Sequence, residues 1–223
     1  YNKIEKEVKK IINYVEFEVE MYNYLPNNFL FIFPFMKSNI LARQLEIALQ
    51  QFWIDKFKDT EYQTKVLINH PYWANKIDDN EFYSYVYLHK SEEGQPIDLK
   101  VSEHSTRIMT IHASKGNGCE VVFLLGCSEG ALKVFSKETG NLVYDSLLHV
   151  AITRQKKSIY IGIQDNNDDI CKRFKPLGIV GDKDILPNIH NIRTFSHQSK
   201  LIDYCINCEE AFKSIDEGII QDA

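Results

Sequence analysis

Two short polar runs hold the side chains best suited to phosphate chemistry. Residues 110–116 read Thr-Ile-His-Ala-Ser-Lys-Gly, and residues 149–157 read His-Val-Ala-Ile-Thr-Arg-Gln-Lys-Lys. Lys115 and Gly116 follow an apolar segment, a position where backbone N–H groups and an ammonium can bind phosphate oxygens. Arg154 adds a guanidinium that stays charged at every physiological pH. Together the two runs favour a site for nucleotide phosphates.

The residues before these runs predict a strand flanked by two helices. Apolar residues recur at helical spacing through residues 1–25, and Pro26 with two asparagines then interrupts the pattern. Residues 29–33 form a continuous apolar run, which is typical of a strand buried on both faces of a parallel sheet. Ser38 and Asn39 predict the start of a helix that reaches residue 58.

The rest of the chain alternates predicted strands and helices, with one irregular stretch between. Residues 59–105 lack a long periodic segment and are interpreted as an insertion or small subdomain. We expect strands over 107–111, 120–126 and 158–163, and a helix over 142–153, as in a parallel α/β sheet. Beyond residue 166 we expect only short helices, over 169–174 and 198–214.

Composition excludes several classes of protein. The 223 residues are 44% hydrophobic, which is enough for a buried core, and the net charge of −5 excludes a globally basic nucleic-acid coat. Five scattered cysteines and no signal peptide predict reduced thiols in an intracellular protein. The longest apolar run, residues 29–36, is too short to cross a membrane. Because the chain begins at Tyr1 and has no Gly-x-x-x-x-Gly-Lys-Ser/Thr loop, we expect a fragment that lacks the usual phosphate cradle.

Arg154 alone does not decide the function. An arginine aimed at a γ-phosphate can accelerate phosphoryl transfer by about three to five orders of magnitude. An arginine at a helix end is, however, usually a solvated partner of the last carbonyls. The neighbouring motifs are therefore needed to choose between these two interpretations.

The order of the motifs resembles the C-terminal motor domain of superfamily 1 helicases of the UvrD, Rep and PcrA type. Residues 110–116 match motif V, which in that family reads Thr-x-His-x-x-Lys-Gly. Residues 149–157 match motif VI, which reads Tyr-Val-Ala-Leu-Thr-Arg-Ala-Lys-Lys. Residues 29–49 are similar to motif IV, a strand that ends in a basic residue followed by Ser/Thr-Asn and a helix. The resemblance covers residues 1 to about 165.

The resemblance implies a fold and a division of the chain. The fold class is α/β, with a RecA-like parallel sheet flanked by helices, lacking the phosphate loop and carrying a small insertion and a C-terminal appendage. The motor domain is expected in two parts, 1–58 with motif IV and 106–165 with motifs V and VI. The insertion occupies 59–105 and the appendage 166–223.

The resemblance also implies roles for individual residues. Arg154 would be the catalytic arginine finger and a contact of ATP, together with Lys37, Lys115 and Gly116. Lys37 stands where the bacterial enzymes carry arginine, so that position keeps the charge but loses the bidentate fork. Contacts to nucleic acid would come from Thr110, His112 and Thr153. No metal ligand is predicted in this chain.

The implied activity is that of an ATP-dependent DNA helicase or translocase that moves 3′ to 5′. ATP with Mg²⁺ would be bound mainly by an N-terminal RecA-like domain absent from these residues, and single-stranded DNA would be the other partner. The fragment alone is expected to be inactive, and no membrane partner is expected. Two alternatives remain open: a non-catalytic helicase-like scaffold or interaction module, and an RNA translocase of the same superfamily.

One departure from the family pattern favours the scaffold alternative. The family continues with Leu-Glu after the Lys-Gly of motif V, whereas Gly118 occupies the glutamate position here.

Other features of the sequence are weaker candidates for a function. Tyr72 and Trp73 are the best candidates for stacking on bases, although aromatic residues mostly fill cores. The Cys205 and Cys208 pair lacks a second close pair of Cys or His residues at zinc-like spacing. Lys156 and Lys157 are interpreted as a solvated helix end or a contact to the phosphate backbone.

Overall fold

A computed structural model describes residues 2–67, 70–77, 83–90, 97–134, 141–163 and 189–192. The predicted helices over 169–174 and 198–214 lie outside these residues, as do Cys171, Cys205 and Cys208. The helices are α1 (Asn2–Tyr22), α2 (Ile40–Lys56), α3 (Thr60–Leu67), α4 (Pro71–Ile77), α5 (Glu129–Lys133) and α6 (Asn141–Ile152), with 3-10 turns η1 (Pro26–Asn28) and η2 (Lys100–Ser102). The strands are β1 (Phe29–Phe33), β2 (Val86–Leu88), β3 (Thr106–Thr110), β4 (Cys119–Cys127), β5 (Gln155–Ile163) and β6 (Ile189–Ile192).

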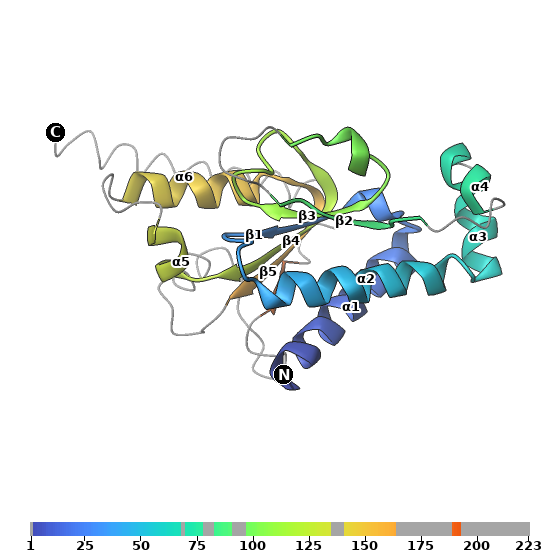
Figure 1. The fold of residues 1–223 in the computed structure, drawn as a ribbon, viewed down its shortest axis with the longest axis horizontal. Helices are drawn as coiled ribbons and strands as arrows, with labels where there is room; N and C mark the ends of the chain where they lie inside the picture. Colours follow the sequence, from blue (N-terminus) through green and yellow to red (C-terminus); the bar gives the residue numbers. More distant parts are fainter. Residues whose placement is uncertain are drawn as a thin grey trace.

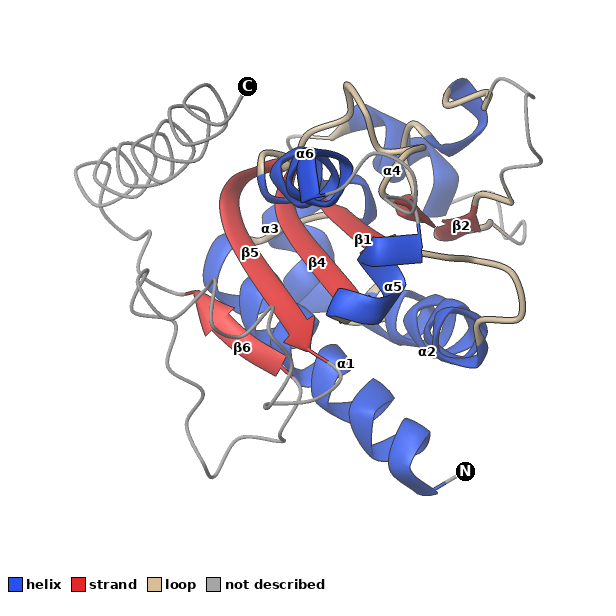
Figure 2. Cartoon of the chain, turned by 90° about the vertical axis from the view of Figure 1, so that its left-hand side faces the viewer, coloured by secondary structure: helices blue, strands red, loops and turns tan. Residues whose placement is uncertain are grey.

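The strands form one sheet in the order β2-β3-β1-β4-β5-β6. The first five strands are parallel, and β6 pairs antiparallel with β5. Helices α1 and α2 cover one face of the sheet and α6 covers the other (Figures 1 and 2). This confirms the predicted RecA-like α/β sheet flanked by helices.

The predicted central strand is present because its sequence suits burial on both sides. All five residues of β1 are buried, and β1 lies between β3 and β4. Phe31 stacks on Phe123 of β4 at a ring-centroid distance of 4.6 Å on the face that α1 and α2 cover. Leu30 and Ile32 point instead into the core beneath α6. Such two-sided burial explains the lack of alternation in the run.

The structure adds a strand where the sequence indicated only an insertion. Val86–Leu88 pairs with β3 as the outermost parallel strand, so the range 59–105 includes part of the main sheet. Trp73 is only 3% exposed and packs against Phe57 and Tyr85, which confirms the interpretation that such aromatic residues fill the core and excludes base stacking for this residue. Tyr72 is exposed and stacks on His104.

The start of β5 corrects a second prediction. β5 begins at Gln155, three residues before the predicted Ser158, so Lys156 and Lys157 belong to a strand and not to a helix end. Both lysines are exposed because they precede the buried middle of β5. The polar character of the strand's first residues hid the true boundary.

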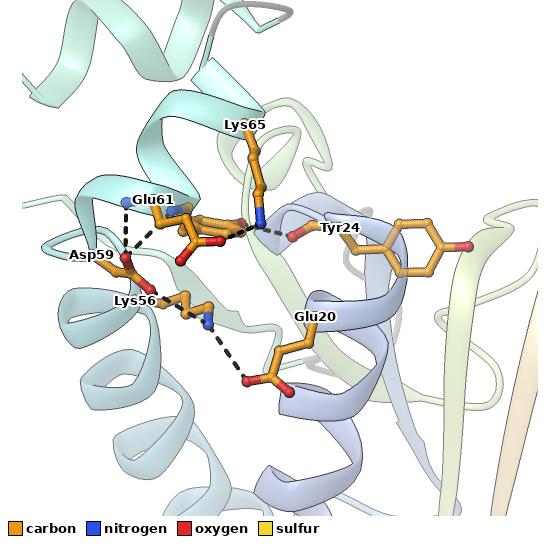
Figure 3. Close-up of polar contacts among 7 residues, drawn as sticks. Glu20, Tyr24, Lys56, Asp59, Glu61 and Lys65 are labelled. Atoms are coloured by element: carbon orange, nitrogen blue, oxygen red, sulfur yellow. Dashed lines mark hydrogen bonds and ion pairs between the residues drawn. The ribbon is translucent and has the colours of Figure 1, made fainter.

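A polar cluster joins α3 to the helical layer (Figure 3). Lys56 Nζ lies 3.9 Å from a carboxylate oxygen of Glu20 on α1 and 3.9 Å from one of Asp59. The Tyr62 hydroxyl donates to the backbone carbonyl of Tyr24 at 2.7 Å, and burial raises the pKa of Tyr62. The surface ion pairs contribute less than about 1 kcal/mol each, so the buried tyrosine provides the main anchor.

A buried hydrogen-bond chain fixes the amino ends of β1 and β3. The Trp53 indole N–H donates to Thr106 Oγ1 at 3.0 Å, and that hydroxyl donates to the Pro26 carbonyl at 2.8 Å. These polar groups are buried and have partners, as stability requires.

No described helix is both long and apolar enough to span a bilayer.

Candidate functional site

The two ends of the parallel strands hold different sets of the predicted residues. At the carboxyl edge, where the strands end, Phe33 of β1 pairs with Thr110 of β3, and the Ile111 N–H donates to the Phe33 carbonyl at 3.0 Å. Lys37 and His112 follow these strand ends within a few residues and are exposed. The structure therefore brings Lys37, Thr110 and His112 to one edge of the sheet.

The loop over residues 111–118 crosses the sheet from one edge to the other. It leaves β3 at the carboxyl edge and must enter β4 at the amino edge, because both strands are parallel to β1. A helical turn starts it, in which Thr110 Oγ1 accepts from the Ala113 N–H at 3.2 Å. The buried Ser114 hydroxyl donates to the Ile111 carbonyl at 2.7 Å. Lys115 and Gly116 lie exposed in the middle of this crossing.

Gly116 has a backbone conformation that a side chain would strain. Its φ is +85°, in the region that L residues rarely adopt, although a Cβ there would meet no atom within 4 Å. Gly116 lies in a turn that is closed by a backbone hydrogen bond, in which the Asn117 N–H donates to the Ser114 carbonyl at 2.9 Å. Glycine is therefore used for backbone freedom at this position and not for close packing.

The two polar runs meet at the amino edge of the sheet. The Cys119 N–H donates to the Arg154 carbonyl at 3.0 Å, and Cys119 pairs with Gln155 across the sheet. A Cβ on Gly118 would lie 3.3 Å from the Arg154 carbonyl oxygen, closer than side chains usually approach. The absent side chain at residue 118 lets the first run approach the second, which gives a steric reason for the missing glutamate.

The Arg154 side chain is half-buried and folds back on the end of α6. Its Nε donates to the Val150 carbonyl at 2.8 Å, and Nη2 donates to Thr153 Oγ1 at 3.0 Å. The Thr153 hydroxyl itself donates to the His149 carbonyl at 2.9 Å. Arg154 thus caps the helix in this state, which matches the ordinary role of a cation at a helix C-terminus.

The predicted residues therefore separate between the two edges of the sheet. Thr153 lies with Arg154 at the amino edge, Lys37, Thr110 and His112 lie at the carboxyl edge, and Lys115 and Gly116 lie in the crossing between the two edges. The structure does not bring Lys37 together with Arg154, although both were predicted to contact ATP. It also separates Thr153 from Thr110 and His112, which were predicted to share the nucleic acid.

Charges at the amino edge extend beyond the predicted set. Lys156 Nζ lies 3.5 Å from a carboxylate oxygen of Glu120, next to the Gly118 and Arg154 contact. Arg107 Nη2 donates to the Cys119 sulfur at 3.0 Å. Burial raises the pKa of the Cys119 thiol, against the opposing effect of Arg107. Arg107 was not among the predicted site residues, and its signal was a charged residue directly before the apolar residues Ile108 and Met109 of β3.

The carboxyl edge is neutral in its histidines at pH 7. Desolvation lowers the pKa of His112, so its imidazole is uncharged and acts by hydrogen bonding. His89, at the end of β2, is buried and shares a 2.8 Å hydrogen bond with Ser102 Oγ. Its pKa is also lowered, by desolvation first and by Arg107 second.

Neither edge gathers metal ligands in the part of the chain that the structure describes. Arg154, Lys156 and exposed backbone suit the oxygens of phosphate groups, while the metal bound to such phosphates would need carboxylates from elsewhere. Thr110 and His112 offer neutral hydrogen-bonding groups of the kind that contact the sugar-phosphate backbone of a nucleic acid.

Comparison with known proteins gives one family. The model of the UvrD-like helicase C-terminal domain matches residues 42–166, which is more than half of the chain. No curated protein and no solved structure gives a significant match.

Proposed function

Because the chain belongs to the family of UvrD-like helicase C-terminal domains, we propose that it is the second motor domain of an ATP-dependent superfamily 1 DNA helicase or translocase. In this proposal Arg154 is the arginine finger. ATP and Mg²⁺ are held mainly by an N-terminal RecA-like domain and meet Arg154 at the amino edge of the sheet. Single-stranded DNA runs across the carboxyl edge. The motor works inside the cell and moves 3′ to 5′, as the family resemblance implies.

The observation that carries the proposal is the backbone contact between the two motif runs. The Cys119 N–H bond to the Arg154 carbonyl fixes the residues that follow motif V against Arg154 of motif VI. A change at the Arg154 end can therefore be transmitted along residues 111–118 to Thr110 and His112. Such a connection is what a motor needs to couple nucleotide state to its grip on DNA.

The resting contacts of Arg154 are compatible with a finger. Its guanidinium is bonded to a helix-end carbonyl and a hydroxyl, both neutral acceptors. A phosphate oxygen carries charge and forms a hydrogen bond roughly twice as strong. A nucleotide bound between this domain and the N-terminal domain would therefore draw the Arg154 side chain away from the end of α6. Further phosphate contacts in this proposal come from Lys115 and Gly116 in the 111–118 loop and from Lys156 at the start of β5.

The same contacts support a second candidate, a non-catalytic scaffold. Arg154 acts here as a helix cap, and Gly118 removes the carboxylate that the family places near the nucleotide. A domain that kept the fold and lost the motor would retain both features. The two candidates differ in whether Arg154 affects turnover or only stability.

The test uses the full-length protein with its N-terminal motor domain. Arg154→Ala should lower kcat for DNA-stimulated ATP hydrolysis by about three orders of magnitude or more. Its Kd for single-stranded DNA should stay within twofold of the unchanged protein. Lys6→Ala is the control, because Lys6 is an exposed cation on α1, outside both motif runs. The 223-residue chain alone should not hydrolyse ATP.

Two results would count against the finger. Unchanged ATP turnover in Arg154→Ala, with a lower unfolding temperature, would leave only the capping role and favour the scaffold. Parallel loss of turnover and DNA binding would mean that Arg154 has a structural role. Circular dichroism on each variant separates misfolding from loss of chemistry.

A further inference from the structure

The strand β2 has an outer side that no described strand covers. It stands at one end of the strand order, and among the described strands only β3 pairs with it (Figure 2). The Tyr85 carbonyl and the His89 N–H form backbone hydrogen bonds to β3 at 2.8 and 2.9 Å. Because the backbone groups of a strand point alternately to its two sides, those of Val86 and Leu88 point away from β3. An edge of this kind can accept an extended peptide as a further strand.

One part of this outer side is already bonded to side chains of the same chain. The Val86 N–H donates to Gln50 Oε1 of α2 at 3.2 Å, and the Val86 carbonyl accepts from the Ser84 hydroxyl at 2.7 Å. The Gln50 amide also donates to the Tyr83 carbonyl at 2.8 Å. A side-chain amide carries the same donor and acceptor as a peptide group. Gln50 therefore stands where a peptide group of a further strand would bond to β2.

The outer side of β2 is closed at Val86 and open at Leu88. The backbone of Leu88 forms no hydrogen bond on that side with any described residue. A helix cannot supply the missing partner, because the N–H and C=O groups within a helix are bonded to one another. An extended segment presents a free N–H and a free C=O along its side, and it is the backbone conformation that fits this edge.

A groove of about 590 Å³ follows the open edge. It is lined by β2 and the residues beside it, by Glu46 of α2, and by Ile97, Asp98 and Val101. Helix α2 packs on one face of the sheet, whereas Leu99, within the segment 97–101, packs on the core beneath α6. The groove therefore lies between the layers that cover the two faces, at the level of the sheet itself. A strand added to β2 would occupy this position.

The two sides of the groove differ in chemistry. Val86 points into the core on the α2 face, so Tyr87 points to the opposite face, the side of the segment 97–101. Tyr87 is 36% exposed and Val101 is 55% exposed, which leaves apolar surface on that side. On the other side α2 contributes the carboxylate of Glu46. The side chains of an extended segment alternate between two faces, so one segment can meet both sides.

We propose that the open edge of β2 binds an extended segment of a partner protein, which adds to the sheet as a strand with apolar residues on one face and a basic residue on the other. The apolar residues contact Tyr87 and Val101, and the basic residue lies toward Glu46. The backbone of the segment bonds to Leu88. This interface goes beyond the proposed function, because it involves neither the ATP contact nor the DNA contact.

The experiment measures, by anisotropy, binding of the full-length protein to the fluorescein-labelled peptide Ser-Val-Lys-Val-Thr-Val-Ser. Two further peptides carry N-methyl groups, one on its three valines and the other on Lys and Thr, and these block opposite sides of the extended backbone. One methylated peptide should bind at least about tenfold more weakly than the parent, through the lost hydrogen bonds and the added methyl groups, and the other should bind equally well. Equal affinity of the two methylated peptides would overturn addition as a strand. Lack of saturable binding of the parent peptide up to about 1 mM would overturn the proposal.

Variants of the protein locate the binding to this edge. Leu88→Pro removes the outward N–H and should weaken peptide binding at least about tenfold; proline is tolerated in an edge strand where the N–H faces solvent. Glu46→Lys should weaken binding of the lysine peptide about threefold and strengthen binding of a peptide with glutamate in its place. This exchange preserves the test where the proline variant fails to fold. Glu5→Lys is the control, because Glu5 is an exposed glutamate on α1 outside the groove. Full binding by both edge variants would contradict the proposal.

Two other results would assign the edge to a different occupant. Sedimentation of the peptide-free protein should show no dimer that Leu88→Pro abolishes; such a dimer would place a second copy of the chain at β2. Unlabelled oligo(dT) should leave peptide binding unchanged, and competition with the peptide would place nucleic acid there. Either result would overturn the partner segment.

Discussion

At the carboxyl edge of the sheet, the exposed groups include Lys37 and His112, and the pKa of His112 is lowered. At the amino edge they are a half-buried guanidinium and a lysine that pairs with a carboxylate. The carboxyl edge resembles a surface for an extended nucleic-acid backbone, whereas the amino edge offers concentrated charge at one point. Open α/β sheets usually bind ligands at the carboxyl ends of their strands, and here the groups at the amino edge suit a different ligand.

One segment belongs to both edges. Residues 111–118 begin beside Thr110 and end beside Arg154, because a connection between parallel strands must return across the sheet. The comparison therefore predicts two kinds of variants, those that affect one ligand only and those that affect the communication between ligands.

The largest effect on single-stranded DNA binding is expected from removing the polar groups of Thr110 and His112, at the start of this segment. The double variant Thr110→Ala with His112→Ala should weaken single-stranded DNA binding by at least about 150-fold, since each of two hydrogen bonds to a charged backbone contributes about 1.5 kcal/mol or more. The KM for ATP should remain within twofold. Anisotropy and steady-state ATP hydrolysis check the two expectations. Thr64→Ala with His70→Ala is the matched control, since both residues are exposed on or beside α3. A raised KM for ATP would break the separation of the edges.

A smaller effect is expected at the middle of the segment. Gly116→Ala should lower the free energy of unfolding by about 1 kcal/mol, because its φ of +85° strains any residue with a Cβ. It should also reduce the stimulation of ATP hydrolysis by DNA more than the basal rate. Urea unfolding and ATPase assays with and without DNA measure both. Gly130→Ala is the control, since that glycine lies in α5 with open space around it. Equal losses in basal and stimulated rates would argue against communication through this segment.

The sequence predicted the elements whose patterns depend only on local residues. The apolar run of β1 required burial on both faces, and the Asn39 cap marked the start of α2 one residue later. β2 was missed because three residues with one buried, one exposed and one intermediate side chain form no recognisable pattern. Its strand exists because β3 offers an unpaired edge, which depends on residues far away in the sequence.

The residues of the candidate site were predicted from the order of the motifs, and the structure shows only how they are arranged. Motif order placed Arg154 and Gly118 near phosphate chemistry, but their contact depends on the pairing of β4 with β5 across more than thirty residues. The resemblance to motif IV assigned Lys37 to ATP, and it carries no information on the edge of the sheet at which Lys37 lies. A residue that follows a parallel strand and a residue that precedes one lie at opposite edges, and this rule alone separates Lys37 from Arg154.

A pH effect tests the histidine of the carboxyl edge. Desolvation lowers the pKa of His112 in the folded chain below the ordinary histidine value of about 6.5. As the pH falls below that value, His112 takes up a proton in the unfolded chain before it does so in the folded chain. The stabilising contribution is complete above that pH and is lost as the pH falls toward the folded value. Urea unfolding of the purified chain at pH 7.5 and 5.5 should therefore show a smaller decrease for His112→Asn. An equal decrease would mean that His89 and other groups account for the whole effect.

The smallest effect is expected from Thr153, which the resemblance assigned to nucleic acid and the fold places beside Arg154. Thr153→Val removes the hydroxyl that accepts from Arg154 Nη2 at 3.0 Å and donates to the His149 carbonyl at 2.9 Å. Single-stranded DNA affinity should change less than twofold, while the apparent KM for ATP should fall slightly, because Arg154 loses one of its resting contacts. Thr64→Ala again serves as the control for a lost threonine hydroxyl bonded to its own helix. A tenfold loss of DNA affinity would place DNA at both edges of the sheet, and the division between the edges would then describe the fold without describing the ligands.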